Sequence, residues 1–171
     1  MCKQAQRDVL KQAKQRFQSI LGNYGLVDND LVCAIPRKSK PNVVGYYSHM
    51  SQFRSRARIV VDVAAIEAEF PDDALGASEQ VHMTLAHEYG HVIAECIRFM
   101  ESQGASFTAP TWRDEFENDE EEFAEDFARF CITKTAYHAA FWQRFIPAYV
   151  SDFNRLFSVS PEQESQYAQI A

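Results

Sequence analysis

The chain of 171 residues is 46% hydrophobic and 13% aromatic, which is enough apolar material to close a core within one domain, residues 1–171. It has neither the roughly 20 consecutive apolar residues of a membrane span nor the apolar segment of a signal peptide. We therefore expect no membrane association and a cytoplasmic location, with non-standard export left open. The four cysteines form no CxxC pair and lie far apart, so they indicate neither a thiolate zinc site nor a dithiol redox motif and are expected to be reduced thiols, mostly buried.

The formal charge of −7 is divided unevenly along the chain. Residues 1–58 carry eleven Lys and Arg against three Asp and Glu, a net +8, while residues 59–171 carry a net −15. A basic segment of this kind can attract nucleic acid or an acidic protein, although a solvated basic face is the commoner case. Nucleic acid is therefore one candidate partner of the N-terminal part.

The first predicted element is an amphipathic helix over residues 1–22, because apolar residues recur at helical spacing among Lys, Arg and Gln until Gly22. Three short β-rich runs follow, LVCAI (31–35), NVVGYYS (42–48) and RIVVDV (58–63). FPDD at 70–73 breaks the pattern and precedes a long helix, predicted from about Ser78 to about Glu101 and closed by Gly104.

The C-terminal part is predicted as a loop followed by two helices. The loop covers residues 105–118, and the next helix runs from about Glu117 to about Lys134. The last helix is rich in aromatic residues and contains Pro147, a candidate kink. The polar tail, residues 160–171, is expected to fray.

The long helix contains His87-Glu88-Tyr89-Gly90-His91, the pattern H-E-x-x-H. Histidines four residues apart differ by about 40° around a helix, so both imidazoles can reach one ion from one face. Zinc binds imidazole well, and a catalytic zinc site takes three protein ligands and keeps a fourth position for water. Glu88 stands beside this face, where its carboxylate can accept a proton from that water and pass it to a leaving amine.

The surroundings of the motif favour a metal site over a chance occurrence of the pattern. Most of the circumference of this helix is apolar, which is typical of a buried helix. One stripe is polar and would be costly to bury unless something such as a metal satisfied it. It consists of Thr84, His87, Glu88, His91, Glu95 and Arg98.

A third ligand is expected from the acidic segment DEFENDEEEFAEDFARF, residues 114–130, because no histidine lies in the ten residues after His91. If 117–134 is helical, Glu121 projects into the protein, toward the arc of Ala128 and Ile132, so its carboxylate most needs a partner. Glu125 lies one turn further on, at the edge of the same face, where it can support a ligating histidine.

The remaining carboxylates of this segment are expected to face solvent. The pair Glu122 and Asp126 has the E-x-x-x-D spacing of other zinc proteases, but it falls on the polar stripe of the predicted helix, so it ranks second as a source of the ligand. No role beyond solvation is expected for Glu122 and Asp126. The same holds for Asp114, Glu115, Glu117, Asp119 and Glu120.

At these residues the chain resembles the gluzincins, zinc metallopeptidases whose third ligand is a glutamate on a second helix. MTLAHEYGHVI resembles the active-site helix of the ImmA/IrrE-type metallopeptidases. EEFAEDFARF resembles the second helix of the anthrax lethal factor catalytic domain and of the secreted Pro-Pro endopeptidases. The resemblance implies an α+β, minimal zincin-like fold, in which a small mixed sheet of about three strands packs on the H-E-x-x-H helix, followed by a glutamate-bearing helix and a C-terminal helix.

The resemblance also implies a role for individual residues. His87, His91 and Glu121 become the ligands of one Zn²⁺, Glu88 the general base, and Glu125 a supporting carboxylate. RIVVDV becomes a candidate for the edge strand with which an extended substrate pairs, although as a core strand it would need no such role. The group that stabilises the oxyanion is unassigned, with Tyr46, Tyr47, His49 and Tyr137 as candidates.

The expected function is that of a zinc-dependent metalloendopeptidase, which hydrolyses peptide bonds with metal-activated water and a glutamate general base. Its partner would be a protein or peptide substrate. The alternative is a catalytically silent or highly restricted zinc-site protein that acts by binding a regulatory partner. A helical adaptor without metal is a third interpretation, but it leaves the polar stripes on two buried helices unexplained.

Overall fold

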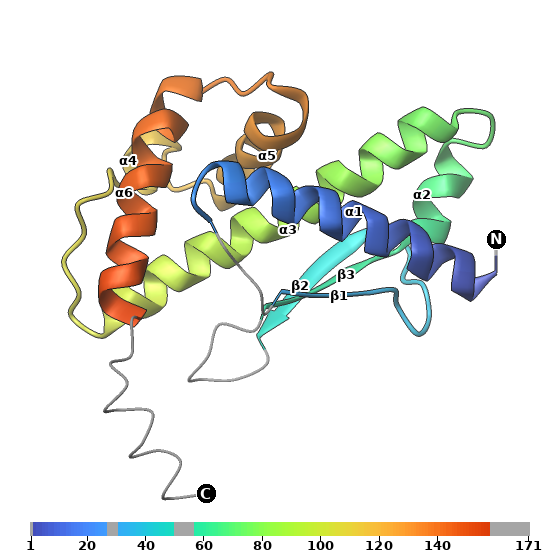
Figure 1. Cartoon of the computed structure of the whole chain (residues 1–171), viewed down its shortest axis with the longest axis horizontal. Coiled ribbons are helices and arrows are strands. Elements are labelled where there is room, and N and C mark those ends of the chain that lie inside the picture. Colours follow the sequence, from blue (N-terminus) through green and yellow to red (C-terminus); the bar gives the residue numbers. More distant parts are fainter. Residues whose placement is uncertain (1, 27–30, 50–56, 158–171) are drawn as a thin grey trace, which may run out of the picture.

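The computed structural model describes residues 2–26, 31–49 and 57–157; the tail predicted at 160–171 lies outside them. Within these ranges the chain forms six α-helices and one three-stranded mixed sheet, which confirms the α+β class. Figure 1 shows the long helix α3 running through the molecule, with α1 beside it and the sheet against it, and with α4, α5 and α6 toward its C-terminal half. No helix in the described ranges is both long and apolar enough to cross a membrane.

The sheet has the strand order β1-β3-β2 and is formed by β1 (Val32–Ala34), β2 (Gly45–His49) and β3 (Ala57–Val61). Strand β1 pairs with β3 in parallel and β2 pairs with β3 antiparallel. The strand in RIVVDV is thus central, so its candidate role as the edge is wrong and the alternative, a core strand, is confirmed. Ile59, Val60 and Val61 are all buried, as expected for a strand covered on both faces. The edge next to the motif helix is β2.

Helix α1 (Lys3–Asn23) lies on α3 through its apolar face, where the ring of Phe17 meets Tyr89 edge-on at 5.4 Å. The short helix α2 (Val63–Glu69) follows β3 directly. It was not predicted from the sequence. It begins there because Asp62 ends the strand and accepts a hydrogen bond from Ala65 N at 3.1 Å as an N-cap.

Helix α3 (Ala74–Ser102) begins four residues before the predicted Ser78. Asp73 explains the earlier start, because its carboxylate caps the helix by accepting from Gly76 N at 2.8 Å. Sixteen residues of α3 are buried, which confirms the prediction of a buried helix. The H-E-x-x-H residues lie near its middle, so neither motif histidine depends on a fraying helix end.

The remaining elements are α4 (Trp112–Glu115), α5 (Glu120–Ala128), the π-helical turn η1 (Arg129–Thr133) and α6 (Ala139–Phe157). Helix α4 lies inside the predicted loop. Helix α5 begins at Glu120 because Glu117 and Asn118 have positive φ and the side chain of Asp119 then caps the helix. Lys134, in the left-handed conformation, ends η1, and α6 continues through Pro147.

Helices α3 and α5 cross at very close range, and Gly90 makes this approach possible. A Cβ atom added to Gly90 would lie 2.7 Å from the Cα and 3.1 Å from the Cβ of Ala124. The obstructing atoms belong largely to the backbone of α5, which cannot turn aside as a long side chain can. Two small residues therefore set the distance between the helix that carries the histidines and the helix that carries the glutamates.

Gly90→Ala is expected to push α5 away from α3 and to lower the free energy of unfolding by about 1–3 kcal/mol, the usual cost of overpacking. Urea unfolding measures this change. Gly22→Ala in α1 is the matched control, since a Cβ there meets no atom within 4 Å. Equal stability of the Gly90 variant and the control would contradict the close contact.

Candidate metal centre

A cleft of about 780 Å³ opens between the edge strand β2, the middle of α3 and the start of α5. Its walls come from three separate parts of the chain. They are Asn42 to Tyr47 from β2 and the residues before it, Gln80, Met83, Thr84, His87, Glu88 and His91 from α3, and Glu120, Glu121 and Glu125 from α5. Every residue predicted as a ligand, base or supporting carboxylate therefore borders one cavity.

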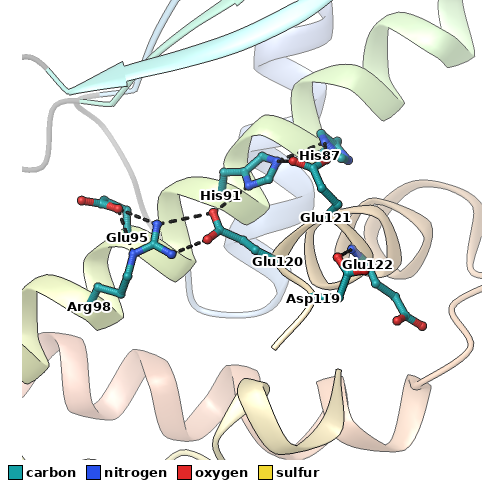
Figure 2. A network of polar contacts seen from close by, with 8 residues as sticks. All are labelled: His87, His91, Glu95, Arg98, Asp119, Glu120, Glu121 and Glu122. Carbon is teal, nitrogen blue, oxygen red and sulfur yellow. Dashed lines mark hydrogen bonds and ion pairs between the residues drawn. The ribbon is translucent and has the colours of Figure 1, made fainter. Parts of the chain in front are cut away.

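The structure brings His87, His91 and Glu121 together at this cleft (Figure 2). The Nε2 atoms of the two histidines are 3.2 Å apart. Glu121 places Oε2 at 3.4 Å from Nε2 of His87 and Oε1 at 3.4 Å from Nε2 of His91. Two imidazole nitrogens and one carboxylate thus converge on a single point from two helices.

Two further carboxylates face the opposite nitrogens of the same rings. His91 Nδ1–H donates to Glu120 Oε1 at 2.8 Å, and Nδ1 of His87 lies 3.6 Å from Glu125 Oε2. An Nδ1 that is hydrogen-bonded to a carboxylate holds the ring proton, which leaves the lone pair of His91 on Nε2. Burial lowers the pKa of His87, and the nearby His91 lowers it further. Glu121 and Glu125 raise it, but by less, so a positive charge on this ring is disfavoured.

These distances fit a tetrahedral zinc ion. Ligand atoms at about 2.0–2.1 Å from such an ion are about 3.3–3.4 Å apart, close to the 3.2 Å between the two Nε2 atoms and the 3.4 Å from each Nε2 to the nearer oxygen of Glu121. Without a cation, the lone pairs on Nε2 of His87 and His91 would face each other and the carboxylate of Glu121. The donor set, the tautomers and the spacing therefore all fit one divalent cation.

Glu88 lies on the cleft side of α3, next to the two histidines in the sequence, and is 8% exposed. Burial raises its pKa to about 7, and the nearby Glu121 adds to the rise, whereas His91 and a hydrogen bond from the backbone of Tyr47 oppose it. A carboxylate with a pKa near neutrality can both accept and release a proton.

Strand β2 fits closely against Glu88 because Gly45 has no side chain. A Cβ atom on Gly45 would lie 2.5 Å from Cγ2 of Thr84 and 2.9 Å from Oε1 of Glu88. Two residues further along the strand, Tyr47 stacks on the ring of His91, with 5.7 Å between centroids and 14° between planes. The edge strand therefore holds both Glu88 and His91 in place.

The exposure of Glu121 differs from the sequence-based expectation. Its side chain is 77% exposed, so it does not project into the protein, although its carboxylate does meet the two histidines. It borders an open cleft, which helical phase alone does not distinguish from the solvent face. Of the four oxyanion candidates, Tyr46 and Tyr47 line the cleft; Tyr137 is exposed and lies on Arg129, and the side chain of His49 lies outside the description.

Several acidic residues that were expected only to be solvated have structural partners, among them Glu115, which lies 3.0 Å from Nδ1 of His138. Glu120 is the hydrogen-bond acceptor of His91, and Asp119 caps α5. Asp126 is 1% exposed and accepts hydrogen bonds from the backbone N–H groups of Tyr137 and His138 and from the indole of Trp142. Asp126 is therefore committed to the start of α6, and the second-ranked pair Glu122 and Asp126 does not border the cleft.

Comparisons of the chain with protein-family models, with curated proteins and with solved structures found no match. The motif and the geometry of the cleft are therefore the basis for assigning a function.

Proposed function

We propose that the protein is a zinc-dependent endopeptidase of the gluzincin type, with a zincin-like arrangement of sheet, motif helix and glutamate helix. The observation that carries the proposal is the convergence of His87 Nε2, His91 Nε2 and the Glu121 carboxylate at separations of 3.2–3.4 Å. These three residues would hold one Zn²⁺. The bound ion would supply a Lewis acid that activates water and stabilises negative charge on a peptide carbonyl oxygen.

The protein side of the reaction falls to groups already placed around the cleft. Glu88 would take a proton from the attacking water and deliver it to the leaving amine, a task that suits a carboxylate with a pKa near 7. Glu120 and Glu125 would keep the protons of the imidazole rings on Nδ1, which leaves both Nε2 atoms free to bind. Glu121 completes the ligand set at the open side of the cleft.

Strand β2 would bind the peptide substrate. It is the outer strand of the sheet next to the motif helix, and the residues from Asn42 to Tyr47 line the cleft. An extended peptide can add to such an edge through main-chain hydrogen bonds, which are independent of its sequence. This mode of binding favours an unfolded or extended segment as the substrate.

Metal analysis together with a cleavage assay tests the proposal. Purified protein should contain close to one zinc per chain and should cut an unfolded protein such as casein at internal bonds. A chelator should abolish cleavage and added zinc should restore it. Full zinc occupancy without cleavage of any substrate would instead favour the alternative, a zinc-site protein that acts by binding a partner, and an absence of bound zinc would refute both.

A further inference from the structure

His91 is fixed on three sides, which makes it the more tightly held of the two motif histidines. Its Nδ1–H donates to Glu120 at 2.8 Å, the ring of Tyr47 covers one face, and Nε2 points toward His87. The orientation of this ring thus depends on where the Glu120 carboxylate lies. Glu120 is the first residue of α5, where the chain has just turned through two positive-φ residues, so its position needs support from outside its own helix.

Arg98 supplies that support from α3, two turns after His91 (Figure 2). Its Nη1 donates to Oε2 of Glu120 and its Nη2 lies 3.4 Å from Oε1 of the same carboxylate. The guanidinium is itself held by Glu95, whose Oε2 accepts from Nε at 3.0 Å and from Nη2 at 2.6 Å. The chain of contacts therefore runs from Glu95 through Arg98 and Glu120 to His91.

We infer that Arg98 is a positioning residue of the metal centre, which holds Glu120 on Nδ1 of His91 and so keeps the lone pair of Nε2 directed into the site. The inference rests on the proposed metal site, not on the identity of a substrate. A guanidinium suits this task because its planar fork can bind two carboxylates at once, which an ammonium group cannot do in the same geometry. The network also explains why Glu95 and Arg98 extend the polar stripe of α3 beyond the motif.

The ordinary interpretation of such a pair is a partly exposed ion pair that joins two helices and adds little to stability. The chain offers a matched example, because Arg113 of α4 makes a bidentate ion pair with Glu101 of α3, the helix that also carries Arg98. Both N–O distances are 2.8 Å. Neither Arg113 nor Glu101 lines the cleft. Arg113→Gln therefore controls for the loss of a bidentate ion pair on α3 as such.

Zinc affinity is the first readout. Arg98→Gln should weaken zinc binding about 10-fold, near the lower end of the effect of changing groups that support a ligand, while Arg98→Lys should restore part of the loss. Arg113→Gln should bind zinc as the wild type does. Thermal unfolding of the zinc-free variants shows whether the two arginine substitutions cost similar stability. Equal zinc affinity in the Arg98→Gln, Arg113→Gln and wild-type proteins would overturn the inference.

A double-mutant cycle tests whether Arg98 acts through Glu120. Once Glu120→Gln has removed the charged acceptor, adding Arg98→Gln should lower zinc affinity by no more than about 2-fold further. Losses that multiply in full would mean that Arg98 affects the site by another route, which would contradict the inference.

The tautomer of His91 gives a readout that needs no metal. Side-chain ¹⁵N chemical shifts of the zinc-free protein should report His91 as the Nδ1–H form in the wild type and in Arg113→Gln. In Arg98→Gln this form should give way to a mixture of tautomers. An unchanged His91 tautomer in Arg98→Gln would refute the positioning role even if zinc binds. If the wild type fails to bind zinc, the proposed function is refuted, and the tautomer measurement still decides the role of Arg98.

Discussion

Glu88→Gln is expected to leave one zinc ion bound and to lower the rate of peptide hydrolysis by a factor of about 10²–10⁴, the range for loss of a general base. Glutamine matches glutamate in size but cannot accept a proton. The substitution should not weaken metal binding, because the donor groups that converge are those of His87, His91 and Glu121, and Glu88 is not among them. Metal content and cleavage rate, measured on the same preparation, separate the two properties.

Glu101→Gln is a suitable control for this substitution. It changes a carboxylate of the same helix that pairs with Arg113 and does not line the cleft. It should retain both zinc and activity. A Glu88→Gln protein that cleaves as fast as the wild type would show that the base is another group.

Glu121→Ala is expected to lower zinc affinity by at least about 100-fold, since it removes one of three ligands and the loss should exceed that for a supporting group. Zinc should also stop raising the melting temperature of this variant, because a ligand stabilises the folded state only as far as it binds. A zinc titration followed by competition with a chelator gives the affinity, and a thermal scan with and without zinc gives the stabilisation.

Glu122→Ala is the matched control, because it changes the next residue of the same helix and the same charge. The side chain of Glu122 is 53% exposed and its carboxylate lies near His138, at 3.9 Å from Nε2, instead of near the cleft. It should bind zinc normally. If Glu122→Ala loses zinc while Glu121→Ala retains it, the register of α5 against α3 is wrong.

The local parts of the site could be predicted from the sequence. The four-residue spacing of His87 and His91 fixes their common face within one helix, and the structure has that helix. The helices and the three short strands also followed from helical periodicity and β-rich runs, whereas the mixed sheet was an expectation from the family resemblance. These features depend on neighbours in the chain, so the pattern of residues contains them.

The parts that depend on tertiary contacts were harder to predict. Helical phase pointed to Glu121 because a carboxylate outside the core was assumed to face bulk solvent, and Glu121 was placed toward the core. In the structure Glu121 is exposed, but it faces an open cleft. Asp126 looked like a surface residue because its partners, the first residues before and within α6, lie more than ten positions away. The strand order could not be read either, so the edge was assigned to the wrong strand.

Two signals for the site were present in the sequence and could have been used. Gly90 lies inside a buried helix, where glycine is costly unless another backbone comes close, and here Ala124 does. Glu120 precedes the predicted ligand and carries the acceptor for His91, while Arg98 is the only Lys or Arg in the polar stripe of α3. A positive charge on a largely buried helix indicates an acidic partner, and the partners here are Glu95 and Glu120.

The most direct test of the central claim is the cleavage of a defined peptide library by the zinc-loaded protein, with the new termini identified by mass spectrometry. The wild type should cut internal peptide bonds, and the Glu88→Gln protein, loaded with the same amount of zinc, should leave the library almost intact. A library that remains intact with the zinc-loaded wild type, or one that the two proteins cut alike, would contradict a zinc endopeptidase with Glu88 as its base.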